Sequence, residues 1–138
     1  MFHLSIVTAE QSTYEGDVDM LIAPAVDGEI GILMNHHPIV TKLGPGAIRI
    51  VKPDKTEQIL FTSGGFLEFI NNKATILADV TENIEAIEAQ QAHSAREKAR
   101  ELLRTAKSDL DRERLEEEIK VHTIRERLAE ISKYRKQK

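Results

Sequence analysis

The sequence predicts an α+β protein in which an N-terminal β-sandwich is followed by a C-terminal antiparallel two-helix hairpin. All seven glycines and all four prolines lie before residue 66, so strong turn signals are confined to the first part of the chain. Short β-rich runs lie between these signals, a pattern typical of all-β sandwiches and barrels. The 59 residues after Asp79 contain neither Gly nor Pro, and their apolar side chains recur at helical spacing.

The first strand is predicted where Phe2, Leu4 and Ile6 alternate with other residues at a loose period of two. Further β-rich runs predict strands over residues 18–23, 30–34, 47–52, 58–62, 66–70 and 74–78. The turn signals between them are Glu15-Gly16-Asp17, Asp27-Gly28, Gly44-Pro45-Gly46, Lys52-Pro53-Asp54-Lys55 and Asn71-Asn72-Lys73. The last of these favours a hairpin because Asn tolerates the left-handed backbone region. We therefore predict a β-sandwich domain over residues 1–82.

Residues 83–138 are predicted to form the helical hairpin. The apolar face of its first helix is mostly alanine, which permits close approach but buries little area; the residues are Ile84, Ile87, Ala92, Ala95, Ala99, Leu102 and Ala106. Lys107-Ser108-Asp109 is the predicted break, with Ser108 as the N-cap of the second helix. The apolar residues of that helix are Leu110, Leu115, Ile119, Val121, Ile124, Leu128 and Ile131. The seam, meaning the apolar stripe along which the two helices would pack, is therefore narrow. A hairpin with so narrow a seam is predicted to be only marginally stable by itself.

Charge is distributed unevenly along the 138 residues, whose net charge is −4. Residues 1–82 hold five Lys and Arg against eleven Asp and Glu, a net charge of −6. Residues 83–138 hold fourteen against twelve, and the last fourteen residues hold six basic and two acidic side chains. The two parts should therefore present different surfaces, and the chain has no general attraction toward nucleic acid or anionic lipid. No apolar run is long enough to predict a membrane-spanning helix, and no signal peptide is predicted.

The sequence offers few groups for catalysis. It has no cysteine, which excludes disulfides, thiolate zinc sites and a Cys nucleophile. The glycine turns at residues 44–46 and 63–65 lack the Lys of a phosphate-binding loop, and no esterase elbow is present. His36 and His37 are adjacent and would point to opposite faces of a strand, and the Glu side chains at 116–118 fan around a helix. We therefore predict no catalytic residue, metal or cofactor, which weighs against a small all-β enzyme.

Three stretches in the first 80 residues are specific in combination. They are Ile6-Val7-Thr8 with Tyr14-Glu15-Gly16, then Gly28-Glu29-Ile30-Gly31-Ile32-Leu33-Met34-Asn35-His36-His37-Pro38, then Ser63-Gly64-Gly65-Phe66-Leu67-Glu68 with Thr75-Ile76-Leu77-Ala78-Asp79. In this order and spacing the chain resembles the bacterial-type ATP synthase epsilon subunit. The remainder matches that family by architecture, by length and by the hinge that begins at Lys107.

The resemblance implies a non-catalytic subunit of a rotary, proton-driven ATP synthase. In that family the β-sandwich contacts the gamma subunit and the ring of c subunits on the rotating central stalk. The two helices lie folded or extend toward the alpha and beta subunits of the catalytic head, where they restrain ATP hydrolysis. The resemblance also implies a peripheral location at the cytoplasmic face of the cell inner membrane, without membrane insertion and without a nucleic-acid partner.

The family's ring-contacting loop matches this chain at Glu29 and His36, so the resemblance implies that both contact the ring of c subunits. We expect both residues in a loop; turn chemistry at Glu29 and a capping role for His36 are the alternative interpretations. The resemblance also implies that the positive charge of the second helix meets the catalytic head; the residues are Arg112, Arg114, Arg125, Arg127, Lys133, Arg135 and Lys136.

Some members of the family bind ATP through an Ile-Asp-x-x-Arg-Ala motif at the start of the first helix. We match this motif to residues 84–89, where Glu85 replaces the Asp and Glu88 replaces the phosphate-binding Arg. A carboxylate at that position would repel a triphosphate. An ATP-sensing module is therefore only the alternative hypothesis. An ATP titration would distinguish it from the leading hypothesis, a non-catalytic subunit of the ATP synthase.

Overall fold

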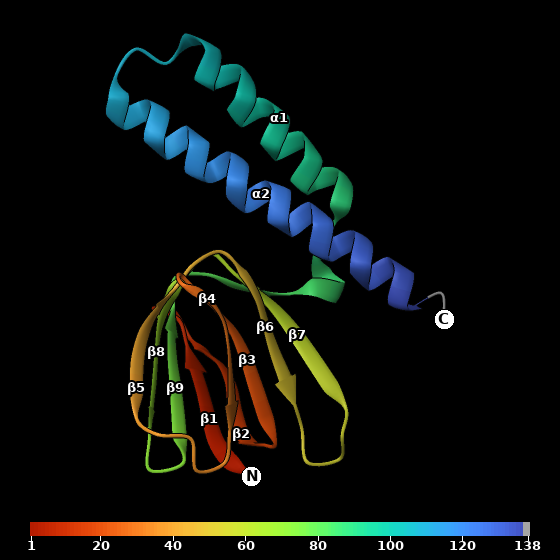
Figure 1. The fold of residues 1–138 in the computed structure, drawn as a ribbon. Helices are drawn as coiled ribbons and strands as arrows, with labels where there is room; N and C mark the ends of the chain where they lie inside the picture. Colours follow the sequence, from red (N-terminus) through yellow and green to blue (C-terminus); the bar gives the residue numbers. More distant parts are fainter. Residues whose placement is uncertain (137–138) are drawn as a thin grey trace. The chain divides into compact units, whose positions relative to one another are not determined.

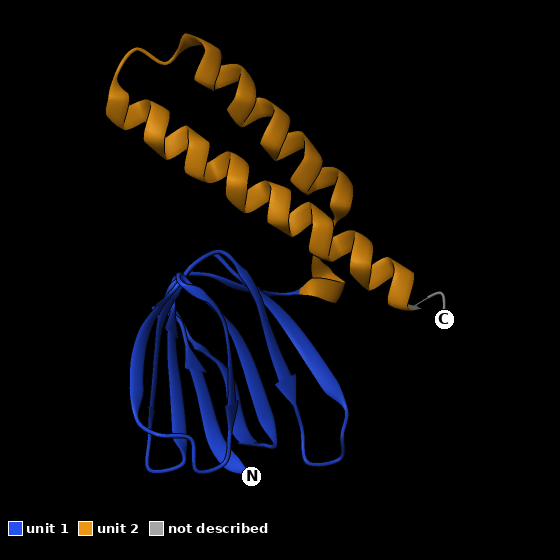
Figure 2. Ribbon diagram, viewed as in Figure 1, with its two compact units in different colours: residues 1–83 blue, residues 84–138 orange. Residues whose placement is uncertain are grey.

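The computed structural model describes residues 1–136 and divides into two compact units, residues 1–83 and residues 84–138 (Figure 2). The first unit contains the ten strands and the second contains the helices (Figure 1). The predicted α+β architecture, a β-sandwich followed by two helices, is confirmed. The boundary between the units lies one residue beyond the one predicted after Glu82.

The strands form one continuous sheet that folds into two layers. The strands are β1 (Phe2–Val7), β2 (Ser12–Val18), β3 (Met20–Ala25), β4 (Gly28–Leu33), β5 (Ile39–Leu43), β6 (Gly46–Val51), β7 (Glu57–Thr62), β8 (Gly65–Ile70), β9 (Lys73–Ala78) and β10 (Thr81–Asn83). Their order is β10-β7-β6-β3-β5-β8-β9-β1-β2, with β4 paired to β3. Among the strand pairs of residues 1–136, only β1 and β9 run parallel. The layers join at β3, which pairs with β6 through residues 20–22 and with β5 only at Ala25.

The core of the sandwich is apolar and fully enclosed. The alternation expected from the sequence places Phe2, Leu4 and Ile6 of β1 inside. Phe2 and Phe69 meet edge to face with their ring centroids 5.4 Å apart. The other members of the core are Val18, Leu21, Ala23, Ile32, Leu43, Ile48, Ile50, Leu60, Leu67, Ala74, Ile76 and Ala78. Because this core draws on every strand except β10, the sandwich holds its own hydrophobic stabilisation.

One predicted turn is wrong: Glu15, Gly16 and Asp17 lie inside β2 and pair with β1. The partner strand explains this, because His3 on β1 contacts the carboxylates of both Glu15 and Asp17. Hydrogen bonds to Glu15 and then Asp17 raise the pKa of His3, and the contact with His3 lowers the pKa of Glu15. Cross-strand pairing thus overrides the local turn preference. Strands β5 and β10 were also not predicted from the sequence.

The other turn signals form the turns that they predict. Asn71 and Asn72 both have positive φ, 50° and 57°, and join β8 to β9 as a two-residue hairpin turn. Lys55, with φ of 72°, donates its backbone N–H to the Lys52 carbonyl oxygen at 2.9 Å, which closes the turn at Pro53. These turns fix the register of the hairpins that they connect.

The second unit consists of a 3-10 turn, η1 (Ile84–Ala86), and two helices, α1 (Ala89–Thr105) and α2 (Asp109–Lys136). Ser108 caps α2 as predicted, because its Oγ accepts a hydrogen bond from the Asp111 backbone N–H at 3.1 Å. The first helix begins later than its apolar pattern suggested, so Ile84 and Ile87 precede it.

The seam between the helices differs from the predicted one. Leu102 and Leu110 are exposed, and so is Ile131, which was expected to pack on α1. Ala92 and Ala99 of α1 are buried, and the buried positions of α2 are Leu115, Arg125, Ala129 and Ser132. The seam is therefore small and partly polar, whereas the sequence pattern predicted an entirely apolar one.

A fragment that ends at Glu82 is expected to fold by itself, because it contains all ten strands and lacks only Asn83, the last residue of β10. The physical reason is that the apolar core is complete within residues 2–78. Circular dichroism should show a β-type spectrum with one cooperative thermal transition. A spectrum of disordered chain would contradict the predicted domain boundary.

Candidate interaction surfaces

The two residues expected to contact the c ring lie at opposite ends of one strand. Glu29 lies in β4, opposite Pro24 of β3, and the expectation that it lies in a loop is wrong. His36 follows β4, in the loop that leads to β5. The four strand steps from Glu29 to Leu33 alone extend about 13 Å. A partner can therefore touch both residues only if it lies along β4.

The loop that carries His36 is fixed by a pair of asparagines. The Asn35 backbone N–H donates to Asn72 Oδ1 at 2.7 Å, and Asn72 Nδ2 donates to Asn35 Oδ1 at 3.0 Å. Asn35 has φ of 67°, a conformation that Asn tolerates better than most residues. The half-buried ring of His36 packs edge to face against Phe69, with ring centroids 5.9 Å apart. The imidazole is thus held in a defined position at the surface.

A second surface of the sandwich is apolar and exposed. It lies over β5, β8 and β9, where Val40, Phe66 and Leu77 are 70%, 54% and 58% exposed. A shallow hollow of about 250 Å³ opens there; its lining residues are Val40, Phe66, Leu67, Glu68, Thr75 and Leu77. Clustered apolar side chains on a surface commonly mark a protein-binding face.

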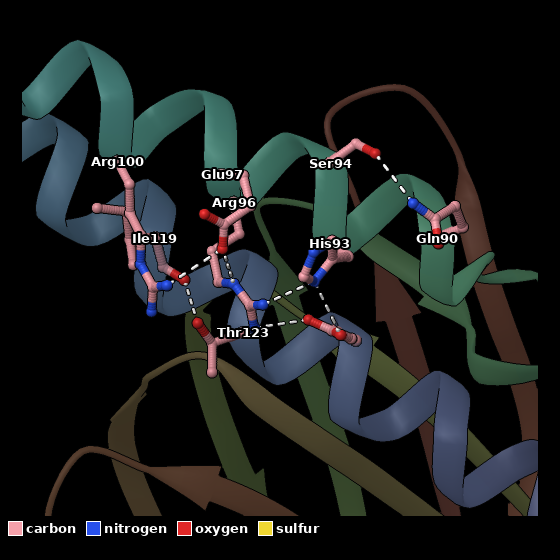
Figure 3. A network of polar contacts seen from close by, with 9 residues as sticks. Gln90, His93, Ser94, Arg96, Glu97, Arg100, Ile119 and Thr123 are labelled. Carbon is pink, nitrogen blue, oxygen red and sulfur yellow. Dashed lines mark hydrogen bonds and ion pairs between the residues drawn. The ribbon is translucent and has the colours of Figure 1, made fainter.

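The hairpin is held by a polar network between its helices (Figure 3). Arg96 Nη1 of α1 forms an ion pair with Glu126 Oε2 of α2 at 2.6 Å. Arg96 Nη2 also donates to His93 Nδ1 at 2.7 Å. His93 Nδ1 in turn lies 3.3 Å from Glu126 Oε1. The side chains of Arg96 and Glu126 are only 16% and 17% exposed, so this pair is screened less than a surface pair would be.

The buried guanidinium of Arg125 extends the network. It is 9% exposed, and it donates to His122 Nδ1 at 3.1 Å and to Gln91 Oε1 of α1 at 3.3 Å. Arg125 is therefore occupied inside the closed hairpin and does not belong to an exposed basic face there. Its contact with the catalytic head stays a prediction for the extended hairpin. Arg125 could make that contact only after the helices separate.

The other basic residues of α2 that are expected to meet the catalytic head are placed differently. Arg112, Arg114, Arg127, Lys133 and Arg135 are exposed, and Arg114 lies 3.9 Å from Asp111 Oδ1. Lys136 ends α2, and its side chain lies outside the described part of the structure. Glu116, Glu117 and Glu118 are exposed, as expected for a solvated helix face. Among residues 1–136, no group of His, Asp and Glu side chains is arranged to hold a metal ion.

The start of α1 corrects the position assigned to the ATP-binding motif. Residues 84–86 form a 3-10 turn, whereas α1 begins at Ala89. A motif that opens the first helix is therefore better matched to residues 87–92, which read Ile-Glu-Ala-Gln-Gln-Ala. In this frame Glu88 replaces the Asp and Gln91 replaces the Arg. The position of the phosphate-binding Arg is then neutral, and its side chain contacts Arg125.

A β-sandwich with an apolar face and a polar edge, joined to a helical hairpin, defines a class of protein–protein interaction subunits. Residues 1–84 match the family described as ATP synthase, Delta/Epsilon chain, beta-sandwich domain. The ATP synthase epsilon chain of Nitrosospira multiformis is 39% identical over 136 residues, which cover 99% of this chain and 96% of that relative. The epsilon chain of Nitrosomonas eutropha is 36% identical over 138 residues, 100% of this chain and 97% of that relative.

A solved structure shares the fold. It belongs to the OSCP/F1/c-ring assembly of the Euglena gracilis mitochondrial ATP synthase, with a TM-score of 0.79 and 20% identity over 88% of this chain and 76% of that chain. The full-length similarity to the bacterial relatives settles the family: this chain belongs to the ATP synthase epsilon chains. Within residues 1–136, no helix is long and apolar enough to cross a membrane.

Proposed function

We propose that this chain is a non-catalytic central-stalk subunit that couples proton translocation to ATP synthesis and restrains ATP hydrolysis through its C-terminal helices. The observation that carries the proposal is the contrast between the two units. The sandwich has a closed apolar core, whereas the hairpin is joined by small residues and a polar network. A seam of that kind can open at modest cost, which is what a regulatory element requires.

Each surface suits one of the proposed partners. The exposed apolar face over β5, β8 and β9 is assigned to the gamma subunit, because apolar area in a rotor subunit is best covered permanently. The edge at β4 and the His36 loop are assigned to the ring of c subunits. The exposed basic residues of α2 are assigned to the alpha and beta subunits of the head, which opposite charge would steer into place.

The proposed location is peripheral, at the cytoplasmic face of the cell inner membrane. The chain would be held there by its protein partners. A pull-down from membranes with the tagged full-length chain tests this assignment. Recovery of gamma and the catalytic-head subunits supports it, and recovery of none of them would contradict it.

Charge reversal at Glu29 together with His36→Ala is expected to weaken attachment of the catalytic head to the membrane sector. The reason is that these side chains are the polar groups at the two ends of β4, where no core contact depends on Glu29. The measurement is ATP-driven proton pumping and head retention on reconstituted membranes. The thermal transition of the variant is the control for folding. Unchanged pumping and retention would show that the ring contact is assigned to the wrong residues.

The alternative function, ATP sensing by the hairpin, predicts saturable ATP binding, which we do not expect in the micromolar range. Gln91 supplies no cation, and Glu126 neutralises Arg96 in the seam where a triphosphate would need positive charge. Calorimetric titration of the full-length chain measures this. Gln91→Arg, which restores the family's arginine, is the matched positive variant. Low-micromolar binding by the native chain would favour the alternative.

A further inference from the structure

Strand β2 is the terminal strand of the sheet, and little apolar packing holds it there. It pairs with β1 and with no other strand among residues 1–136. Val18 is its one fully buried side chain, and Tyr14 packs only partly against the core. Gly16 at its centre has no side chain to pack and loses more conformational freedom on folding than other residues. Polar contacts with β1 therefore matter more for this strand than for the inner ones.

These polar contacts centre on His3 of β1. Glu15 and Asp17 of β2 are two residues apart, so both side chains lie on the face of the sheet that carries His3. His3 Nδ1 lies 3.3 Å from Asp17 Oδ1, and His3 Nε2 contacts Glu15 Oε2. Ser5 Oγ donates to the other carboxylate oxygen of Glu15 at 3.1 Å. Each ring nitrogen of His3 thus faces a different carboxylate.

This arrangement suits the protonated imidazole and no other form of it. A neutral imidazole has one N–H, so it can donate to one carboxylate and turns a lone pair toward the other. The imidazolium has two N–H groups, donates to both carboxylates, and forms the stronger, charge-assisted kind of hydrogen bond. In agreement with the geometry, hydrogen bonds to Glu15 and then to Asp17 raise the pKa of His3. The hydrogen bond to His3 is also the main cause of the lowered pKa of Glu15.

The other cations nearby do not take over the role of His3. Lys73 of β9 is in register with His3 on the far side of β1, and its charge also attracts Glu15. The Met1 amino group contacts Met34 Sδ at 3.5 Å. With His3 protonated, the charges of His3 and Lys73 balance those of the two carboxylates. With His3 neutral, one negative charge is left over, and the two carboxylates of β2 repel each other.

We propose that His3 is a pH-sensitive clamp at the edge of the sandwich: its imidazolium holds the terminal strand β2 against β1, and loss of the proton loosens that strand. The stabilisation acts over a limited pH range. Because the pKa of folded His3 lies above its ordinary value of 6.5, the contribution of His3 is complete below pH 6.5 and is lost as pH rises through the raised pKa. The contribution of Glu15 is lost in acid, as pH falls through its lowered pKa. Strand β2 is held most firmly between these two limits.

The test is hydrogen exchange of the β2 amides in the full-length chain, expressed as protection factors so that the intrinsic effect of pH on exchange is removed. From about pH 6 to about pH 9, protection of β2 should fall by about twofold to fivefold, as expected when exposed ion pairs are lost. Amides of the β6–β7 hairpin should keep their protection. An equal fall in β6 and β7 would show that the whole sandwich responds, and the clamp on β2 would be refuted.

Two variants of His3 separate the proton from the ring. His3→Arg carries its charge at every pH used, so the protection of β2 should stay high and no longer depend on pH. His3→Gln carries no charge, so protection should be low throughout. His37→Gln, which removes an exposed histidine of the loop after β4, is the matched control and should keep the native pH dependence. A pH dependence of β2 that survives in His3→Gln would overturn the proposal.

An independent measurement follows the ring of His3 itself by NMR. Its titration midpoint should be higher in the native chain than in the double variant Glu15→Gln with Asp17→Asn, because the variant lacks both acceptor charges. Both substituted positions are exposed, so the fold should be retained. Equal midpoints in the two proteins would mean that the carboxylates do not hold the proton on His3, and the clamp would fail on that ground alone.

Discussion

Removal of residues 108–138 is expected to raise steady-state ATP hydrolysis by the assembled enzyme while ATP synthesis persists. The exposed basic residues of α2 would otherwise contact the catalytic head, and each exposed pair contributes about 0–1 kcal/mol. Several such pairs together amount to about 1–2 kcal/mol, which corresponds to a factor of roughly 5–30 in the restrained population. The measurement is hydrolysis by reconstituted enzyme with the full-length or the truncated chain.

Simultaneous replacement of Arg127, Lys133, Arg135 and Lys136 by Ala should reproduce much of the truncation. Arg125 is left unchanged because its guanidinium contacts Gln91 of α1 inside the closed hairpin. The restraint should also weaken as salt rises, because the Debye length falls from about 10 Å at 0.1 M to about 3 Å at 1 M. Replacing Arg127 alone should do little, since one exposed pair contributes so little. Equal hydrolysis rates for full-length and truncated enzyme, with the chain shown to be bound, would mean that this hairpin is not an inhibitor.

Glu126→Ala is expected to open the hairpin, with the opposite effect on activity. Removing one partner of a fully buried ion pair costs about 3–5 kcal/mol, because the other charge is left unpaired. The side chains of Arg96 and Glu126 are 16% and 17% exposed, so the pair is not fully buried. We therefore expect the variant to lose less stability, about 1–3 kcal/mol. In the proposed function the extended hairpin is the inhibitory form, so ATP hydrolysis should fall below that of the native enzyme.

The matched control for this prediction is Glu130→Ala, one turn further along α2 at an exposed position. It removes the same charge without touching Arg96. The midpoint of helix unfolding, monitored by circular dichroism, should fall for Glu126→Ala and remain unchanged for Glu130→Ala. In the double variant Arg96→Ala with Glu126→Ala, the loss should be smaller than the sum of the single losses. Additive losses would show that the ion pair does not hold the hairpin closed.

The residue patterns suffice for the two-part architecture, for the positions of seven of the ten strands along the chain and for the cap at Ser108. These features follow from local chemistry: glycine and proline punctuate the first part, and side-chain spacing specifies a helix or a strand. The Asn71-Asn72 turn was predictable for the same reason, because it depends on backbone conformations that Asn tolerates. The motif residues also identified the family, which the full-length relatives confirm.

The tertiary structure alone decided which residues meet. The turn signal at Glu15-Gly16-Asp17 was overridden because β1 supplies His3 as a cross-strand partner, and no local pattern reports that. The polar seam was missed because Arg96, Arg125 and Glu126 read as solvated charges until the two helices bring them together. The separation of Glu29 from His36 along β4 likewise depends on how strands pair, which is a property of the folded sheet.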